Sequence, residues 1–369
     1  MHYKEDVAEP HLLFFIGDVM KTSIIPIFIP HIGCPYRCIF CNQWKITGHQ
    51  GVPTGNMVAK EIDTYISSAK EPRHWEVAFY GGSFTAIAVA LQEELLQPAY
   101  EALQNGKIAA IRCSTRPDCI TPAILDRLTA YGMTIVELGV QSMDDNVLQT
   151  AKRGHTAADV VQATALLRAR KFIVGHQLMP GLPGEDIQSL RKTTAAICQL
   201  KPDIARIYPV AVIDKTELAQ MYRQGTYTPL SVHEGVQRGA YMKQAFVKAG
   251  IRVIRTGLQA TQELDDASQV LGGAYTPAMG ELIDTKRYQT RIFAVLDTIQ
   301  AASVQIFYHR TDTSRARGYH NVTVKRARLR YPFTVTWQED NTLHAGEIVV
   351  AAGQTIYTIH IDTEMVSVR

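Results

Sequence analysis

The sequence predicts an α/β protein built around a parallel sheet that curls into part of a barrel, followed by a helical extension and a small β module. From about residue 24 to 210, short β-branched runs alternate with longer amphipathic segments. Polar or glycine-rich residues follow each short run, and after residue 304 the pattern changes to alternating strand-like segments. We expect an N-terminal segment at 1–20, a core barrel at 21–235, a helical extension at 236–303 and a basic β module at 304–369.

Six strand candidates lie in the core, and right-handed crossovers between them would give a partial (β/α)6 barrel of the TIM-like kind. The candidates are Ile24–Ile29, Glu76–Tyr80, Ile108–Cys113, Ile135–Val140, Phe172–Met179 and Ile204–Pro209. Between them we expect helices, several with a capping residue at the entrance and glycine just past the end. These are Asn56–Lys70, Ala88–Gln104, Thr121–Tyr131, Thr156–Lys171 and Glu185–Leu200.

The residues just after each strand matter because the active site of such a barrel lies at the C-terminal ends of its strands. The sixth strand candidate ends at Tyr208-Pro209, and the other five run into polar or glycine-rich residues. These are His31-Ile32-Gly33-Cys34, Gly81-Gly82-Ser83, Ser114-Thr115-Arg116, Gln141-Ser142 and Pro180-Gly181-Leu182-Pro183-Gly184. The sequence therefore places its chemistry at one end of the sheet.

The chain beyond residue 214 is expected to be mainly helical up to residue 300 and then rich in strands. The clearest helices are Val232–Lys248 and Gln289–Ala301, with a turn at Gly272-Gly273. The strands expected in the last part are Asn321–Lys325, Phe333–Gln338 and Thr355–Ile361.

Composition excludes several classes of protein. The chain has 369 residues, of which 46% are hydrophobic and 20% charged, with a formal net charge of +3. A chain of this length can bury a core without disulfide staples. Neither a signal peptide nor an apolar run long enough for a membrane span is visible. We therefore expect a cytoplasmic protein with no membrane association, in which clustered cysteines indicate metal binding or catalysis.

Three cysteines lie within eight residues, at Cys34, Cys38 and Cys41. This spacing suits an iron–sulfur cubane held by thiolates, with one iron left open if no fourth protein ligand joins. The alternative is a zinc site, closed by His31 or His49 as the fourth ligand. The remaining cysteines are isolated and are expected to be buried small hydrophobic residues; they are Cys113, Cys119 and Cys198.

The cysteine motif, with Phe40 just before its third cysteine, resembles the cluster motif of radical S-adenosylmethionine (SAM) enzymes. Five further motifs, in order, resemble the radical SAM core of the elongator catalytic subunit family over roughly residues 20–260. They are Tyr80–Thr85, Ser114–Asp118, Glu137–Ser142, Arg153–Thr156 and Met179–Gly184. The resemblance implies a [4Fe-4S] cluster on Cys34, Cys38 and Cys41, SAM bound at the open iron, and an external electron donor of the flavodoxin or ferredoxin type.

The resemblance also implies roles for residues around SAM. The backbone of Gly81, Gly82 and Ser83 would bind the methionine amine, and Gln141 and Arg153 would contact the ribose and the methionine carboxylate. Ser114 stands where the family has glutamate, and its hydroxyl reaches less far toward the ribose than a carboxylate does. Phe40 and the turn that begins at Met179 would lie near the cofactor, and the strand face of Glu137 stays open. His155 and His176 are either pocket residues or satisfied core histidines.

The segment between Tyr308 and Tyr331 is strongly basic, with a net charge of +6, whereas the rest of the chain carries −3. This basic segment has seven cationic residues: Arg310, Arg315, Arg317, Lys325, Arg326, Arg328 and Arg330. Such a charge is compatible with RNA as a partner, since lysine and arginine neutralise phosphates. It is equally compatible with a solvated strand face.

Two functions follow from the resemblance and stay open. The first is a radical SAM enzyme that cleaves SAM reductively to a 5′-deoxyadenosyl radical and acts on RNA or tRNA. The second is a non-catalytic cluster or haem carrier related to coproporphyrinogen oxidase. The acetyl-CoA-binding acetyltransferase domain of the elongator family is not expected here, because the roughly 110 residues after the core lack its glycine-rich pyrophosphate loop.

Overall fold

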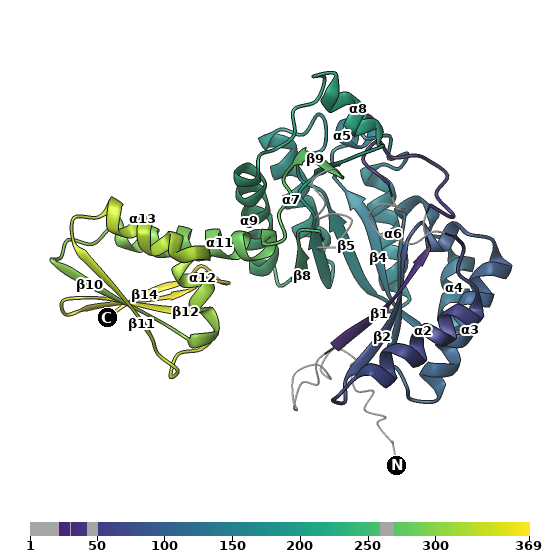
Figure 1. Cartoon of the computed structure of the whole chain (residues 1–369), viewed down its shortest axis with the longest axis horizontal. Coiled ribbons are helices and arrows are strands. Elements are labelled where there is room, and N and C mark those ends of the chain that lie inside the picture. Colours follow the sequence, from purple (N-terminus) through teal and green to yellow (C-terminus); the bar gives the residue numbers. More distant parts are fainter. Residues whose placement is uncertain (1–21, 30, 43–50, 259–268) are drawn as a thin grey trace, which may run out of the picture.

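The core of the protein is a curved sheet of seven parallel strands (Figure 1). The computed structural model describes residues 22–29, 31–42, 51–258 and 269–369. The strands neighbour one another in the order β1 (Thr22–Ile29), β2 (His74–Gly81), β3 (Ala110–Thr115), β4 (Met133–Gln141), β5 (Ile173–Leu178), β6 (Ile204–Ile207) and β8 (Arg252–Thr256). All six pairings are parallel, so the C-terminal ends of the strands meet at one edge. This arrangement confirms the predicted α/β half-barrel.

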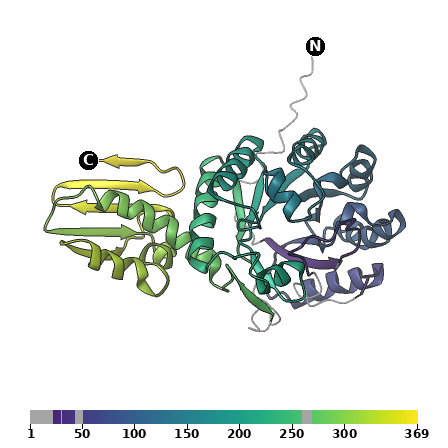
Figure 2. The same ribbon diagram turned by 90° about the horizontal axis from the view of Figure 1, so that it is seen from above.

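Helices cover the outer face of the sheet, as Figure 2 shows. They are α2 (Gly55–Ser68), α3 (Val89–Gln104), α4 (Pro122–Ala130), α6 (Ala157–Ala169), α7 (Ile187–Leu200) and α9 (Val232–Lys248). The shorter helices α5 (Asp145–Thr150) and α8 (Glu217–Arg223) lie instead at the C-terminal edge of the sheet, where both pack against Ile39 and Phe40. Local sequence explains where they begin. Thr54, Thr121, Thr156 and Ser231 each cap a helix by accepting a hydrogen bond from a backbone N–H of its first turn.

The two faces of the sheet differ in chemistry because successive side chains of a strand point to opposite sides. Residues on the outer face are apolar and pack under the helices; Val77, Phe79, Val136 and Leu138 are completely buried there. The concave face instead carries ionised residues, described below. A hydrophobic core on one side therefore leaves a polar surface on the other, next to the strand ends.

The segment after residue 210 contains more strands than we predicted. The seventh strand, β8, lies in the stretch expected to be helical, so the barrel sheet has seven strands and not six. The expected turn at Gly272-Gly273 is also wrong, because both residues lie in β9 (Val270–Gly273), which pairs with β7 (Ala211–Ile213) as an antiparallel ribbon. Short strands of four or five residues give too little alternation to be distinguished by periodicity.

Helix α11 (Met279–Leu296) joins the barrel to a C-terminal module and belongs to the cores of both. Met279 and Ile283 pack with α9, whereas Ile292 and Leu296 pack in the core of the module. We predicted this helix at Gln289–Ala301, and the structure begins it ten residues earlier. In Figure 1 the helix bridges the barrel and the module.

The C-terminal module is a mixed sheet covered by helices, which confirms the predicted small β module. Its strand order is β11 (Thr334–Glu339), β10 (Ser303–Tyr308), β12 (Glu347–Ala352), β13 (Thr355–His360) and β14 (Val366–Val368). Because β10 and β11 are parallel, their connection has to cross over the sheet. It does so through the helices α12 (Thr313–Arg317) and α13 (Val322–Arg330), with short 3₁₀ turns at Arg310–Asp312 and Tyr319–Asn321.

The strand predicted at Asn321–Lys325 is therefore wrong, since this segment begins α13. Its alternating β-branched residues imitate a strand, but the buried residues Thr323 and Ala327 are four apart and lie on one helical face. The basic residues of this segment stand on a helix and not on a strand face.

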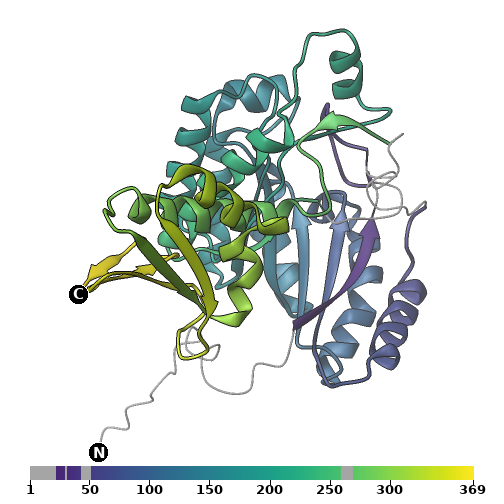
Figure 3. The same cartoon turned by 60° about the vertical axis from the view of Figure 1, so that its left-hand side comes forward.

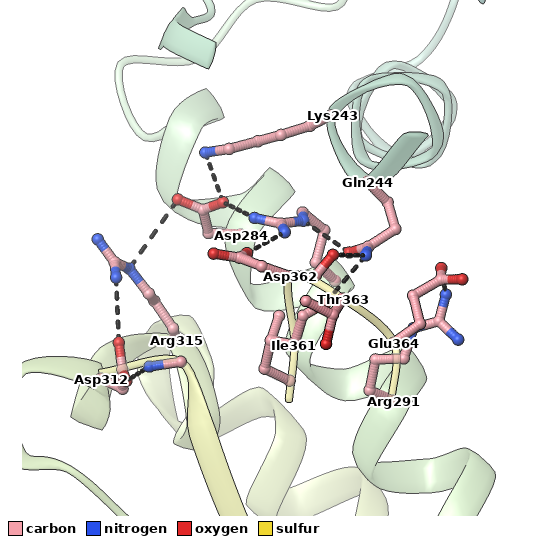
Figure 4. Close-up of polar contacts among 12 residues, drawn as sticks. Lys243, Gln244, Asp284, Arg291, Asp312, Arg315, Ile361, Asp362, Thr363 and Glu364 are labelled. Carbon is pink, nitrogen blue, oxygen red and sulfur yellow. Dashed lines mark hydrogen bonds and ion pairs between the residues drawn. The ribbon is translucent and has the colours of Figure 1, made fainter. Parts of the chain in front are cut away.

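A cluster of ion pairs fixes the module against α9 and α11 (Figure 4). The Lys243 ammonium contacts Asp284 at 2.6 Å, and Arg287 reaches Asp362 at 2.7 Å. Gln244 of α9 donates to the carbonyl oxygen of Ile361 at 2.9 Å. The module is thus held by polar contacts in addition to its shared helix. Among the described residues, no helix is long and apolar enough to cross a membrane.

Candidate functional site

The cysteine loop, residues 31–42, follows β1 at the C-terminal edge of the sheet. Backbone hydrogen bonds attach it to neighbouring elements at both of its ends. Ser83 N donates to Ile32 O at 3.1 Å, Ile39 N donates to Ala151 O at 3.2 Å, and Leu218 N donates to Ile39 O at 2.8 Å. The loop is therefore positioned by three separate parts of the chain.

Two glycines allow the cysteine loop to approach the loop after β2. A side-chain carbon at Gly82 would overlap the carbonyl oxygen of Ile32 and lie 2.7 Å from that of Ile29. Gly33, with φ +74°, has the backbone of Ser83 and Ile87 in the space that a side chain would fill. The motif around Gly82, expected to contact SAM, thus also seats the cysteine loop.

The three cysteines of the loop are partly exposed, with Cys38 and Cys41 against an apolar cluster that includes Ile39 and Phe40. Arg153 Nη1 donates to the Cys38 sulfur at 3.2 Å, which suits a negatively charged thiolate. Burial and the neighbouring Cys38 raise the pKa of the Cys34 thiol, while Arg153 and Arg116 oppose that shift. Cationic groups are therefore already directed at these sulfurs.

In the part of the chain that the structure describes, no three His, Cys, Asp or Glu side chains converge on one point as the ligands of a single metal ion would. A cubane sets a different requirement, because each cysteine binds a different iron. Of the two histidines considered for a zinc site, His31 lies in the cysteine loop, half-buried. His49 lies outside the described residues.

Gln141 and Arg153, for which the sequence predicts contacts to SAM, come together beside the cysteine loop. Gln141 ends β4 in a left-handed conformation (φ +66°), and its side-chain Oε1 is buried without a hydrogen-bond partner among the described residues. Arg153 donates to Gly139 O at 2.6 Å, and its Nε is likewise buried and unpartnered there. A side chain at Gly139 would press on both, since its Cβ would lie 2.8 Å from Arg153 Nη2.

Arg116 is a site residue to which its sequence motif, Ser114–Asp118, assigned no role. Its guanidinium is buried over the Tyr36 ring, 4.9 Å from the centroid, and donates to Asp118 at 2.9 Å. In the described structure, Nε and Nη1 find no partner. Buried donors without partners cost free energy, so these atoms indicate a place for a polar ligand. The sequence signal that could have assigned Arg116 to the site is its position just after β3, at the functional edge of the sheet.

The other predicted cofactor residues lie at the same edge of the sheet. Met179 is partly buried against the apolar cluster of Phe40, and its N–H donates to Gln141 O at 3.0 Å. The Ser83 hydroxyl is engaged within the protein, 2.9 Å from that of Thr115. Ser114 accepts a hydrogen bond from Gln177 at 2.9 Å. These groups have partners within the protein, so the polar atoms left for a zwitterionic ligand such as SAM are the unpartnered ones of Gln141, Arg153 and Arg116.

The concave face of the sheet carries a buried ionic network centred on Glu137, whose orientation the sequence left open. Glu137 accepts from Arg112 Nη2 at 2.7 Å and from Arg206 Nη2 at 3.0 Å, and Arg206 also donates to the Tyr80 hydroxyl at 2.8 Å. Burial alone raises the pKa of the Glu137 carboxyl, but Arg206 and Arg112 outweigh it and hold the pKa below its ordinary value. This face stays ionised at neutral pH and suits a polar substrate.

The two histidines of the core are buried, and each forms a hydrogen bond through Nε2 while its Nδ1 has no partner among the described residues. His176 is fully buried, 3.0 Å from the Thr164 hydroxyl, and burial lowers its pKa to about 3. His155 contacts Val140 O at 3.1 Å, and its pKa is also lowered to about 3, by burial and by Arg153. Both are neutral at physiological pH. Of the isolated cysteines, Cys113 is buried as expected, whereas Cys119 and Cys198 are partly exposed, so the expectation of burial is wrong for these two.

The basic segment lies in the C-terminal module, beside the barrel and away from the cysteine loop (Figure 1). Arg315 and Arg330 are held by ion pairs with Asp312 and Asp297. Five members of the segment form no ion pair with any described residue; they are Arg310, Arg317, Lys325, Arg326 and Arg328. The charge of the segment is thus only partly neutralised.

The arrangement of a cysteine loop at the end of the first strand of a parallel half-barrel is that of a known superfamily. The family pattern described as Radical SAM superfamily matches residues 28–197, and the one described as Radical_SAM C-terminal domain matches residues 202–289. The chain belongs to the radical SAM superfamily of enzymes. Membership implies a [4Fe-4S] cluster and SAM as cofactors.

Within this superfamily the chain is related to proteins named tRNA uridine(34) acetyltransferase. The one from Methanocaldococcus jannaschii is 31% identical over 308 residues, covering 73% of this chain and 56% of that protein. Elongator complex protein 3 of Saccharomyces cerevisiae is 28% identical over 43% of this chain and 32% of its own length. The solved structure of Methanocaldococcus infernus Elp3 with an N-terminal deletion superimposes with a TM-score of 0.60 at 20% identity, covering 95% of this chain and 77% of that one. The chain spans little more than half the length of the acetyltransferases it matches.

Proposed function

We propose that this protein holds a [4Fe-4S] cluster on Cys34, Cys38 and Cys41 and cleaves SAM reductively, with RNA as its class of substrate. The observation that carries the proposal is the meeting of the cysteine loop with buried, unpartnered polar atoms of Gln141 and Arg153. When bound, the cluster and SAM supply a 5′-deoxyadenosyl radical, which removes a hydrogen atom from the substrate.

The protein's own residues orient SAM and exclude water. Gln141 Oε1 can accept from a ribose hydroxyl, while Arg153 Nε and Arg116 Nη1 can donate to a carboxylate. Phe40 and Ile39 close the site from one side, since both are buried in the apolar cluster under the loop. Water is thereby kept from one side of the reacting centre.

Two observations support RNA as the substrate class. The curated relatives that match most of this chain are named for a modification of tRNA, at about 30% identity. The basic segment provides cationic groups without ion pairs on a module fixed to the barrel. Phosphate contacts of this kind position a nucleic acid without reading its sequence. We propose a flavodoxin or ferredoxin as the electron donor.

The test is the formation of 5′-deoxyadenosine by anaerobically reconstituted protein given SAM, dithionite and bulk tRNA. Wild type and a matched Cys198→Ala control should bind iron and form 5′-deoxyadenosine, whereas Cys38→Ala should do neither. The control removes an equivalent thiol outside the cysteine loop. If the wild type binds an intact cubane cluster but does not cleave SAM, the proposal is contradicted and a carrier of clusters or haem is favoured.

A further inference from the structure

A groove between α11 and α13 offers hydrogen-bond donors that no group of the described structure uses. Its cavity has a volume of about 550 Å³ and is lined by Lys286, Gln289 and Phe293 of α11 and by Arg326 and Arg330 of α13. The two helices lie side by side, as the views of Figures 1 and 3 agree. We call this cavity the α11–α13 groove.

Gln289 lines this groove and carries a buried amide nitrogen without a partner among the described residues. The residue is only 4% exposed, and its Oε1 accepts from Arg326 Nη1 at 3.0 Å. Because that bond fixes the orientation of the amide, its Nε2 is left as a donor, and it has no partner in the described parts of the chain. A buried N–H without an acceptor costs free energy, so the groove calls for an acceptor there.

The charge of the groove is positive once its internal ion pair is taken into account. Arg330 and Tyr331 both bind the single lining carboxylate, Asp297, at 2.6 Å. Lys286 and Arg326 have no such counter-ion among the described residues. Burial and the nearby Arg326 both lower the pKa of the Lys286 ammonium, as expected where like charges are crowded. An anion between them would relieve this repulsion.

A second cavity extends the groove, since it is lined by the same Asp297 and Arg330 and continues to Tyr331 and Phe333. The groove is therefore an elongated surface and not an isolated pit. It lies in the module, away from the cysteine loop (Figure 1). A substrate that occupies the groove and also reaches the cysteine loop therefore has to be a long polymer.

We propose that the α11–α13 groove binds the phosphodiester backbone of the RNA substrate, through Lys286, Arg326 and the free amide of Gln289. This inference rests on the proposed function, because it takes RNA as the substrate. Arginine and lysine supply the charge, and an amide N–H supplies a directed hydrogen bond to a phosphate oxygen. Contacts at this distance from the reacting nucleotide would hold the polymer without selecting its sequence.

The test uses fluorescence anisotropy of a labelled RNA stem-loop with reconstituted protein, titrated at several salt concentrations. Lys286→Gln and Arg326→Gln should each reduce the negative slope of log affinity against log salt by about 0.7 to 0.9, which weakens binding about five- to eightfold at 0.1 M salt. Arg326→Lys keeps the charge and should recover most of this loss. Arg252→Gln is the matched control: it removes the same charge from an exposed arginine of β8 that lies outside the basic segment and does not line the groove.

The outcomes separate this inference from the proposed function. Loss of affinity in the two groove variants, with Arg252→Gln unchanged, supports the groove. Equal loss in all three variants indicates a diffuse basic surface and overturns it, as does full affinity in the groove variants. A wild type that cleaves SAM but binds no RNA would overturn both the groove and the RNA substrate. Binding of an acidic peptide such as polyglutamate in place of RNA would have the same consequence. In both cases the proposal of SAM cleavage stands.

Discussion

Replacement of Gly82 by alanine should displace the cysteine loop and lower the iron content of the protein. The added carbon would overlap Ile32 O and stand 2.7 Å from Ile29 O, and both are backbone atoms that cannot rotate away. To restore ordinary contact the loop backbone has to withdraw by about 1 Å. That movement also breaks the hydrogen bond from Ser83 N to Ile32 O.

The magnitude follows from these two effects. Overpacking of this kind costs about 1 to 3 kcal/mol, and the lost hydrogen bond about 1 kcal/mol more. Together they disfavour the native loop by about 2 to 4 kcal/mol, a factor of roughly 30 to 1000. We therefore expect less iron per chain after anaerobic reconstitution and a loss of 5′-deoxyadenosine formation of at least about 100-fold, as for a misplacement of about 1 Å.

The assays are iron and sulfide analysis, the visible absorption of the cluster, and 5′-deoxyadenosine quantified after incubation with SAM and dithionite. Gly272→Ala is the matched control, because its added carbon would lie 3.4 Å from the Tyr222 side chain, at ordinary contact distance. If Gly82→Ala keeps full iron content and activity, the two loops do not need their close approach, and the reasoning is refuted.

Three further changes test other parts of the structure. Glu137→Gln leaves the buried Arg112 and the largely buried Arg206 without their shared carboxylate, so urea unfolding should show a loss of about 3 to 5 kcal/mol. His176 has a folded pKa of about 3, below its unfolded value, so the unfolded chain takes up the proton first as pH falls below 6.5, and the protein loses stability. In His176→Gln, the free energy of unfolding measured with urea should therefore fall less steeply with pH in this range, by about 1.4 kcal/mol per pH unit. Arg287→Gln removes the ion pair with Asp362 and should speed limited proteolysis at the boundary of the module several-fold, most clearly at low salt.

Each of these variants has an exposed counterpart of the same chemistry. Glu61→Gln, His74→Gln and Arg252→Gln change surface residues. The first two should keep a free energy of unfolding within about 0.5 kcal/mol of wild type, and Arg252→Gln should leave the rate of proteolysis unchanged. A control that behaves like its buried counterpart would contradict the role given to burial. An unchanged pH profile in His176→Gln would contradict the neutral state of that histidine.

Much of the fold and of the candidate site could be predicted from local sequence. The spacing of Cys34, Cys38 and Cys41 needs no tertiary information, because all three lie on one loop. The alternation of strands and helices, and the polar residues after each strand, indicated the half-barrel and its functional edge. Short or ambiguous segments failed: β8 was missed, and the start of α13 imitated a strand.

What the sequence by itself determined was the superfamily chemistry, the edge of the sheet where it occurs and the excess of positive charge near the C-terminus. Only the tertiary structure decided which side chains meet, because those contacts join residues that are remote along the chain. Arg153 reaches Cys38 across 115 positions, and Arg326 reaches Gln289 across 37. Helical geometry then divides the basic residues of α13, since Arg326 and Arg330 are four apart and share the groove, while Arg328 lies on another face. Periodicity records which face of an element is apolar, but only packing determines what that element faces.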